Sequence, residues 1–211
     1  MADPSLVAQW LASESVKLGA RDHNESPADK PARQTVAEGG FNAAELIACL
    51  DDWAPADAVV VSDAGNFAHG LLTRFRFDRS RVYLGPVNGA MGYGLPASIG
   101  AKLAAPVRPV LCLAGDGGLL MTIGEMETAV RQGLDLTVVV FNNRAYGTIR
   151  ARQAEAFPGT DFGTSLGEVC FADIARAMGW KAWRACTSRE FQFALDRVSR
   201  SAGCKLIEVN L

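Results

Sequence analysis

The chain has little of what membrane, secreted and nucleic-acid-binding proteins need. Its 211 residues include no apolar run near the ~20 residues that span a bilayer. Met1–Gln9 lacks the basic stretch and long apolar segment of a secretory signal. Lysine and arginine number 21 against 23 aspartates and glutamates, so no basic face for nucleic acid is expected. The sequence predicts a cytoplasmic protein with neither a membrane nor a nucleic-acid partner.

Histidine and cysteine are also scarce. There are 2 histidines and 5 cysteines, and no cysteines have C-x-x-C spacing, which argues against a zinc site or a disulfide framework. Scattered thiols fit a reducing compartment. Apolar residues make up 49% of the chain and the net charge is only −2, which excludes a mainly disordered protein. Glycine is abundant by contrast, with 21 residues that cluster between Gly85 and Gly124.

The chain divides by composition into a short head and one domain. Apolar residues between positions 6 and 11 have helical spacing, and residues 21–33 are polar and contain two prolines. We therefore expect residues 1–38 to form an amphipathic helix and a linker from a preceding domain. Residues 39–211 are expected to form one domain.

From residue 39 onward, apolar strands alternate with helical segments. Strands that are apolar throughout favour parallel pairing with both faces of the sheet covered. The sequence thus predicts an α/β fold, a doubly wound parallel sheet with helices on both faces. The expected helices are 42–50, 96–104, 123–132, 172–178 and 191–199, and the expected strands are 58–62, 109–114, 136–141 and 205–209.

Three expected strands run directly into glycine, aspartate and asparagine, at residues 63–66, 115–118 and 142–147. Taken one at a time, such residues are also typical of turns and helix caps. In open α/β sheets, however, ligands bind outside the carboxyl ends of the strands. The three strand exits together are therefore candidates for a binding site.

The second and third exits indicate a metal site. Residues 118–141 supply one helix and one strand, a single right-handed crossover that places Asp116 and Asn143 at the same end of neighbouring strands. One carboxylate and one amide oxygen suit Mg²⁺, which takes few protein oxygens and completes its octahedron with water and phosphate. Gly117 and Gly118 leave backbone N–H groups open to a phosphate. The pattern predicts a site for Mg²⁺ and a diphosphate.

These residues resemble the signature of thiamine diphosphate-dependent enzymes, in which GDG is followed after about two dozen residues by NN. The segment GDGGLLMTIGEMETAVRQGLDLTVVVFNN carries that signature, and GPVNGAMGYGLPASIGAKLAAP resembles the family's upstream stretch. The resemblance covers roughly residues 40–210 and is closest to the acetolactate synthase-like branch, through MGYGLPASIGA and NNRAYGTIR. It implies the thiamine diphosphate-binding fold, with thiamine diphosphate and Mg²⁺ as cofactors.

The resemblance also implies roles for individual residues. The Mg²⁺ ligands would be the side chains of Asp116 and Asn143 and the backbone carbonyl of Ala145. Met91 matches the apolar residue beneath the thiazolium ring, which forces the cofactor into its bent shape. The implied cofactor-binding residues are Gly65, Asn66, Phe67, Gly89, Ala90, Met91, Gly115, Asp116, Gly117, Gly118, Asn143, Ala145, Tyr146 and Gly147.

The implied activity is that of a 2-oxoacid enzyme that removes CO₂ and transfers the acyl-anion equivalent, as a lyase or a transketolase-like carboligase. A simple 2-oxoacid decarboxylase stays open as an alternative. The tryptophan typical of acetolactate synthases is replaced by Arg152, and the glutamate typical of decarboxylases by Ile149. Arg152 either binds a substrate carboxylate or lies solvated on a helix. Neither the donor nor the acceptor substrate is specified.

The family's activating glutamate lies on a separate pyrimidine-binding domain, which does not fit in 211 residues. No residue of this chain is therefore assigned as catalytic, and we expect the chain alone to be inactive. It would be a fragment of a longer enzyme or one subunit of a two-chain enzyme. The implied partner is a pyrimidine-binding domain of the same or another subunit, in a homo-oligomer. FAD would bind only in the family's middle domain, outside these residues.

Gly92–Ala97 offers a competing interpretation, because it matches the dinucleotide fingerprint G-x-G-x-x-A. A lone match is weak, and no buried strand directly precedes it. A nicotinamide-dependent dehydrogenase is thus the more distant alternative. A non-catalytic relative is disfavoured because Asp116 and Asn143 are both present.

Overall fold

Six strands form one sheet in which every neighbouring pair is parallel, in the order β2-β1-β3-β4-β6-β5. The computed structural model describes residues 41, 43–77 and 80–211, so the expected helix and linker of residues 1–38 lie outside the described residues. The elements are α2 (Ala43–Trp53), β1 (Val59–Ser62), α3 (Asn66–Arg74), β2 (Val82–Leu84), α4 (Gly94–Ala104), β3 (Val110–Gly115), α5 (Asp116–Thr122), α6 (Glu125–Arg131), β4 (Thr137–Asn142), α7 (Gly147–Ala156), α8 (Phe171–Ala177), β5 (Lys181–Ala185), α9 (Ser188–Ser199) and β6 (Lys205–Asn210).

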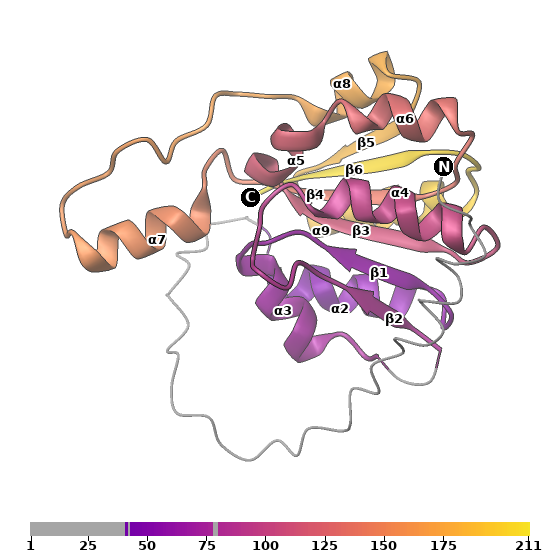
Figure 1. The fold of residues 1–211 in the computed structure, drawn as a ribbon, viewed down its shortest axis with the longest axis horizontal. Helices are drawn as coiled ribbons and strands as arrows, with labels where there is room; N and C mark the ends of the chain where they lie inside the picture. Colours follow the sequence, from indigo (N-terminus) through magenta and orange to yellow (C-terminus); the bar gives the residue numbers. More distant parts are fainter. Residues whose placement is uncertain (1–40, 42, 78–79) are drawn as a thin grey trace.

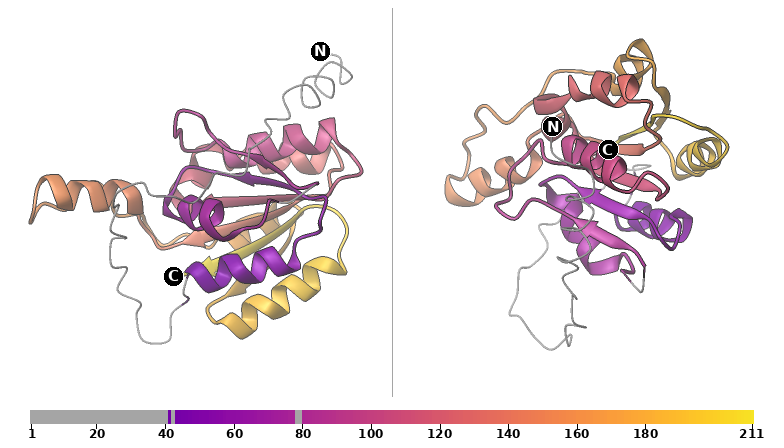
Figure 2. Two further views of the ribbon diagram at one scale, coloured as in Figure 1. Left: turned by 90° about the horizontal axis from the view of Figure 1, so that it is seen from below. Right: turned by 45° about the vertical axis from the view of Figure 1, so that its right-hand side comes forward.

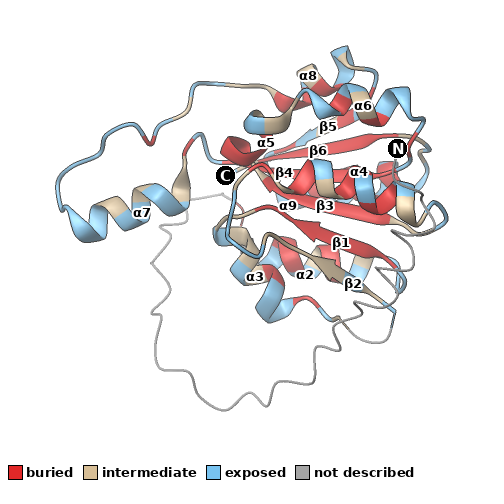
Figure 3. Ribbon diagram, viewed as in Figure 1, coloured by how far each residue is buried: buried red, intermediate tan, exposed pale blue. Residues whose placement is uncertain are grey.

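Helices cover both faces of this sheet, as the sequence predicted (Figure 1, Figure 2). Helices α4, α5, α6 and α8 contribute to one hydrophobic core, and α2, α3 and α9 contribute to the other. Alternate residues of each central strand point to opposite cores: Val138 and Val140 of β4 to the first, Val139 and Phe141 to the second. Strands β3 and β4 therefore have to be apolar almost throughout, and Figure 3 shows them buried.

The central elements match the expected ranges closely, whereas four peripheral ones were missed. Strand β2 has only three residues and lies at a sheet edge, so it carries no long apolar run. Strand β5 alternates exposed with more buried residues. Helix α3 has only one buried residue and α7 has none, which removes the apolar periodicity that marks a helix. Helix α7 also stands away from the sheet (Figure 1).

The segment between β3 and β4 corrects another expectation. One helix over residues 123–132 was expected, but the structure forms α5 directly after β3 and then α6, with Ile123 and Gly124 between them. Helix α5 begins at Asp116, so the strand exit and the helix start coincide. Across the described ranges, no helix is both long and apolar enough to cross a membrane.

A buried ion pair holds the β2 edge onto α2. Asp51 accepts hydrogen bonds from Arg81 Nη1 at 2.5 Å and Arg76 Nε at 2.5 Å, and Arg81 also donates to the backbone carbonyls of Asp51, Ala54 and Pro55. The Arg81 side chain is 8% exposed, whereas that of Arg76 is 64% exposed. Burial alone would raise the pKa of the Asp51 carboxyl, but the hydrogen bonds from Arg76 and Arg81 outweigh it and lower that pKa below 3.8.

We predict that Arg81→Ala lowers the free energy of unfolding by about 3–5 kcal/mol, because it leaves a buried carboxylate without its partner. The matched change Arg76→Ala removes an exposed partner of the same carboxylate and should cost about 0–1 kcal/mol. Urea denaturation measures both. Since the pKa of Asp51 is lowered on folding, the contribution of the pair is complete above pH 3.8 and is lost as the pH falls through the lowered value. Equal effects of the two variants would contradict the assignment.

Candidate functional site

The candidate site lies where the strand order reverses. The chain moves from β1 outward to β2 and then returns to place β3 on the other side of β1. The carboxyl ends of β1 and β3 therefore flank a topological switch point, the usual ligand position in open α/β sheets. Strand β4 pairs with β3, with Phe141 opposite Gly115, so the third exit lies next to the second. The predicted adjacency of these two exits is confirmed.

Asp116 and Asn143 meet at one backbone N–H group. The N–H of Ala145 lies 3.2 Å from Asp116 Oδ2 and 3.1 Å from Asn143 Oδ1. The other oxygen of Asp116 accepts from the N–H of Gly117 at 2.8 Å. Asp116 is only 4% exposed, while Asn143 is exposed. Two side-chain oxygens from different strand exits thus converge on a single positively polarised hydrogen.

The turn after β4 depends on a left-handed residue. Arg144 has a φ of 55°, a conformation that non-glycine residues seldom adopt. Side-chain oxygens stabilise this turn, because Asn142 Oδ1 accepts from the N–H of Arg144 at 3.3 Å and Asn143 Oδ1 accepts from that of Ala145. Such asparagine turns let the side chain replace a backbone acceptor. The turn brings Ala145 back toward Asp116, where it is buried.

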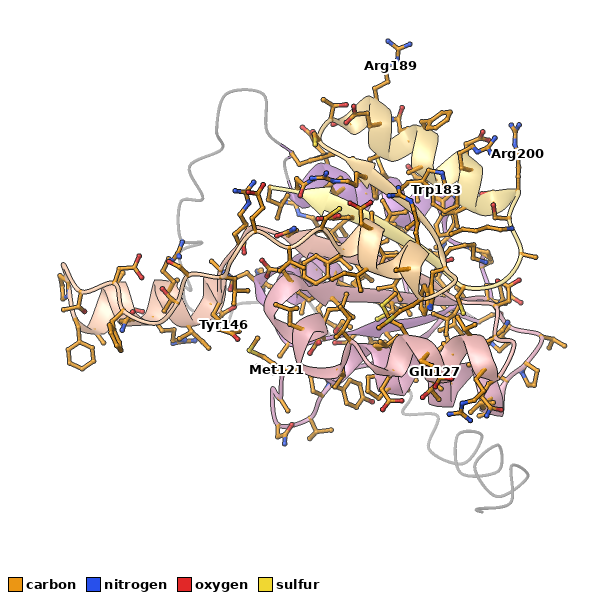
Figure 4. All side chains as sticks on the ribbon, turned by 90° about the horizontal axis from the view of Figure 1, so that it is seen from above. Met121, Glu127, Tyr146, Trp183, Arg189 and Arg200 are labelled. Carbon is orange, nitrogen blue, oxygen red and sulfur yellow. The ribbon has the colours of Figure 1, made fainter. Side chains whose placement is uncertain are left out.

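Glycine at position 117 is required by close packing. A Cβ there would lie 2.5 Å from Cε1 of Tyr146 and 3.3 Å from Cε of Met91. The exit of β3, the turn after β4 and the segment before α4 therefore come together at Gly117. Gly147 is similarly close to Asn143, since a Cβ there would lie 3.0 Å from Nδ2 of Asn143. Figure 4 shows Tyr146 at the base of α7.

Asp63 organises the segment before α4, a role that the sequence analysis missed. It is buried, and its oxygens accept from the N–H groups of Ala64 at 2.7 Å, Gly92 at 3.0 Å and Tyr93 at 3.3 Å. A Cβ at Gly118 would lie 2.5 Å from Asp63 Oδ2, so the exits of β1 and β3 are also in direct contact. An aspartate at the end of an apolar strand was the available signal.

The turn after β1 contacts the other exits through Phe67 and Asn66. The Phe67 ring stacks on Phe141 of β4 with centroids 5.1 Å apart, and a Cβ at Gly115 would lie 3.4 Å from Phe67 Cε1. Asn66 Oδ1 accepts from the hydroxyl of Thr148 in α7 at 2.8 Å. Gly65 directly precedes α3. These contacts bring the first predicted turn into the same cluster.

Some named residues lie further out. Gly89 and Ala90 are exposed, and nothing lies within 4 Å of where a Cβ on Gly89 would be. The contacts therefore do not join these two to the cluster, and their roles stay predictions. Arg152 is exposed on α7, although it is not part of the cluster, and His69 is exposed on α3 or nearly so.

Both buried carboxyls of the site are held in a desolvated setting. Burial raises the pKa of Asp116 above its ordinary value, against the N–H groups of Gly117 and Ala145, which lower it. Burial raises the pKa of Asp63 in the same way, against the N–H groups of Ala64, Gly92 and Tyr93. Asp63 serves backbone donors only, whereas Asp116 shares its donor with a second side-chain oxygen. Asp116 is thus the carboxylate better placed for a cation.

The described ranges contain no group of three or more histidine, cysteine, aspartate and glutamate side chains that could hold a metal ion. A metal at this site would depend instead on one carboxylate, one amide oxygen and backbone carbonyls. Such a donor set is typical of a cation that is shared with a phosphate-bearing ligand.

Comparison with known proteins gives consistent results. The chain is 34% identical over 168 residues to the acetolactate synthase isozyme 1 large subunit of Escherichia coli (strain K12), covering 79% of this chain and 29% of that protein. It is 40% identical over 131 residues to a sulfoacetaldehyde acetyltransferase of Alcaligenes xylosoxydans xylosoxydans, covering 62% of this chain and 22% of that protein. The chain therefore spans less than a third of the length of these relatives.

A solved structure shares the fold. The thiamine diphosphate-dependent 4-hydroxybenzoylformate decarboxylase of Rhodococcus jostii RHA1 superposes with a TM-score of 0.77 at 26% identity, over 88% of this chain and 35% of that one. Residues 63–209 match the family model described as thiamine pyrophosphate enzyme, C-terminal TPP binding domain. This chain, whose three strand exits meet around Asp116 and Gly117, belongs to the thiamine pyrophosphate enzyme family and carries its C-terminal TPP-binding domain.

Proposed function

We propose that the chain is the cofactor-binding part of an acetolactate synthase-like 2-oxoacid enzyme, which decarboxylates its substrate and transfers the acyl group to an acceptor. The observation that carries this proposal is the convergence of Asp116 Oδ2 and Asn143 Oδ1 on one N–H, at the exits of two neighbouring strands. The similarity to an acetolactate synthase and to an acetyltransferase supports the transfer reaction. In this proposal, residues 39–211 are the cofactor-binding domain and residues 1–38 connect it to a preceding domain.

The residues at the exits fit a Mg²⁺ ion. Asp116 and Asn143 would contribute side-chain oxygens, and Ala145 its backbone carbonyl. That carbonyl already accepts from the N–H of Gly147 at 2.8 Å, but a carbonyl oxygen has a second lone pair. A cation here would also offset the cost of burying the Asp116 carboxylate, which is what raises its pKa. The remaining coordination would come from water and the diphosphate.

The remaining predicted residues would hold the organic cofactor. When bound, thiamine diphosphate supplies the electron sink for breaking the bond between the carboxyl and keto carbons. Gly117 and Gly118 have no side chains to keep a diphosphate from the backbone. Met91, whose Sδ-methyl approaches Gly117, would form the apolar wedge beneath the bent cofactor. The rings of Phe67 and Tyr146 would exclude water at the two sides.

We infer that a second domain completes the active site. The relatives are more than three times as long as the matched segment of this chain, which leaves room for a pyrimidine-binding domain. That domain, of the same or another subunit, would supply the carboxylate that activates the cofactor. The relative in Escherichia coli is named a large subunit, which supports an oligomeric assembly.

A simple 2-oxoacid decarboxylase is the second candidate. The structural neighbour from Rhodococcus jostii is named a decarboxylase, and it shares the fold over 88% of this chain. Both reactions begin by removing CO₂ and differ in whether the acyl-anion equivalent then takes up a proton or attacks a second carbonyl compound. Product analysis with a 2-oxoacid, with and without an added aldehyde or 2-oxoacid acceptor, distinguishes them.

The first prediction concerns the metal. Asp116→Ala should abolish the Mg²⁺-dependent binding of thiamine diphosphate, because it removes the only buried carboxylate among the proposed ligands. Isothermal titration calorimetry with and without Mg²⁺ measures this, and Asp173→Ala, which removes an exposed aspartate on α8, is the control. Unchanged binding by Asp116→Ala would contradict the site assignment.

The second prediction concerns the apolar wedge. Met91→Ala should lower the turnover of the complete enzyme by about 10²-fold while changing cofactor affinity far less, because it relaxes the cofactor's bent shape and leaves the metal ligands in place. Steady-state kinetics and cofactor titration measure the two effects. Leu103→Ala, an exposed change on α4, serves as the control. Wild-type turnover in Met91→Ala would refute this role.

The third prediction concerns completeness. The 211-residue chain should consume no pyruvate by itself, even with saturating thiamine diphosphate and Mg²⁺, because it lacks the carboxylate of the second domain. Losing that acid–base group removes about 10²–10⁴-fold of rate. A pyruvate-consumption assay with and without an added pyrimidine-domain partner tests this. Robust turnover by the chain alone would show that the active site is complete within it.

A further inference from the structure

Residues 143–170, here called the arm, leave the sheet after β4 and return to it at α8. The arm carries α7 and stands away from the rest of the fold (Figure 1, Figure 2). Its two limbs pair near the sheet: the N–H of Tyr146 donates to the carbonyl of Thr164 at 2.9 Å, and that of Leu166 donates to the carbonyl of Arg144 at 2.8 Å. Because α7 has no buried residues, the arm's position depends on contacts at its base.

A buried carboxylate lies at that base. Glu208 of β6 is 0% exposed, and its strand neighbours Ile207 and Val209 are apolar core residues. Its Oε1 accepts from Asn142 Nδ2 at 2.8 Å, and its Oε2 accepts from the N–H of Ala172 at 3.0 Å. Cys170 Sγ and Arg184 Nε each lie 3.7 Å from Oε2. All four partners are donors or cations.

These contacts hold both ends of the arm. Asn142 is the residue before the arm begins, while Cys170 and Ala172 lie where it ends. Asn142 Nδ2 also donates to the carbonyl of Val169 at 3.2 Å, so one amide group joins the outgoing and the returning chain. Glu208 therefore fixes the distance between the two limbs.

The same contacts lead to the candidate site. When Glu208 orients the amide of Asn142, the amide oxygen is directed to the N–H of Arg144, at 3.3 Å. That hydrogen bond supports the left-handed φ of 55° at Arg144. The left-handed residue in turn places the N–H of Ala145 against Asp116 and Asn143.

We infer that Glu208 is a positioning residue that clamps both ends of the arm and thereby sets Asn143 and Ala145 relative to Asp116. A carboxylate is suited to this role because it accepts only and can serve several donors at once. A neutral amide of the same shape would turn an N–H₂ group toward another donor. The clamp concerns the chain itself, and only its effect on metal binding depends on the proposed function.

Hydrogen exchange of the ligand-free 211-residue chain tests the clamp directly. Glu208→Gln should lower the protection of the amide hydrogens of Ala145, Tyr146 and Leu166 by about tenfold or more, while the amides of central strand β4 keep theirs. The control is Glu127→Gln, on an exposed part of α6 (Figure 4). Unchanged protection in the arm, or an equal loss in the arm and β4, would overturn the inference. Should Glu208→Gln fail to fold, Asn142→Ala removes the side chain that Glu208 holds and tests the same expectation.

A second experiment follows the effect to the metal. In Glu208→Gln, the Mg²⁺ concentration for half-maximal thiamine diphosphate binding should rise by about 10–100-fold, as for other residues that orient metal ligands. Adding Asn142→Asp to Glu208→Gln exchanges donor and acceptor across the 2.8 Å contact and should restore much of the affinity. A double variant as weak as Glu208→Gln would overturn the inference. Failure of the unaltered chain to bind the cofactor would overturn the proposed function instead, and the exchange experiment would still test the clamp.

Discussion

The geometry of the candidate site depends on one backbone N–H group, that of Ala145, which lies between Asp116 Oδ2 and Asn143 Oδ1. This hydrogen bond joins the ends of two neighbouring strands. It also holds a buried carboxylate at a place where burial raises its pKa. A chain that keeps a charged group under such a cost has it positioned for a positive partner. In the proposed function that partner is the Mg²⁺ of a bound diphosphate.

Close packing around this point explains the glycines of the second exit. Gly117 lies against the Tyr146 ring and the end of Met91, and Gly118 lies against the Asp63 carboxylate. Larger side chains at either position would force apart the strand exits that form the site. Asp63 adds to this by holding the N–H groups of Gly92 and Tyr93 at the start of α4. The glycine-rich segment thus serves the approach of protein backbone to protein side chains before any ligand is considered.

The arm is built differently from the rest of the fold. Its helix buries no residue, and Ile149, Phe157 and Phe162 are all exposed. A helix without an apolar contact gains little from packing, so its position must come from its two ends. Glu208, Asn142 and the paired limbs supply those contacts. The exposed apolar side chains fit the proposal that a second domain covers this side of the molecule in the complete enzyme.

The sequence by itself determined the central architecture and the family. The run Val138–Phe141 is apolar throughout because both faces of a central parallel strand are covered, and the spacing from Asp116 to Asn143 allowed only one crossover. The short edge strand β2 and the unpacked helix α7 left no periodic signal. Tertiary structure alone decided which polar residues face one another. Asp63 and Glu208 are simple acidic residues in the sequence, and their roles arise from donors contributed by segments between 29 and 66 residues away, because backbone N–H groups leave no mark on side-chain pattern.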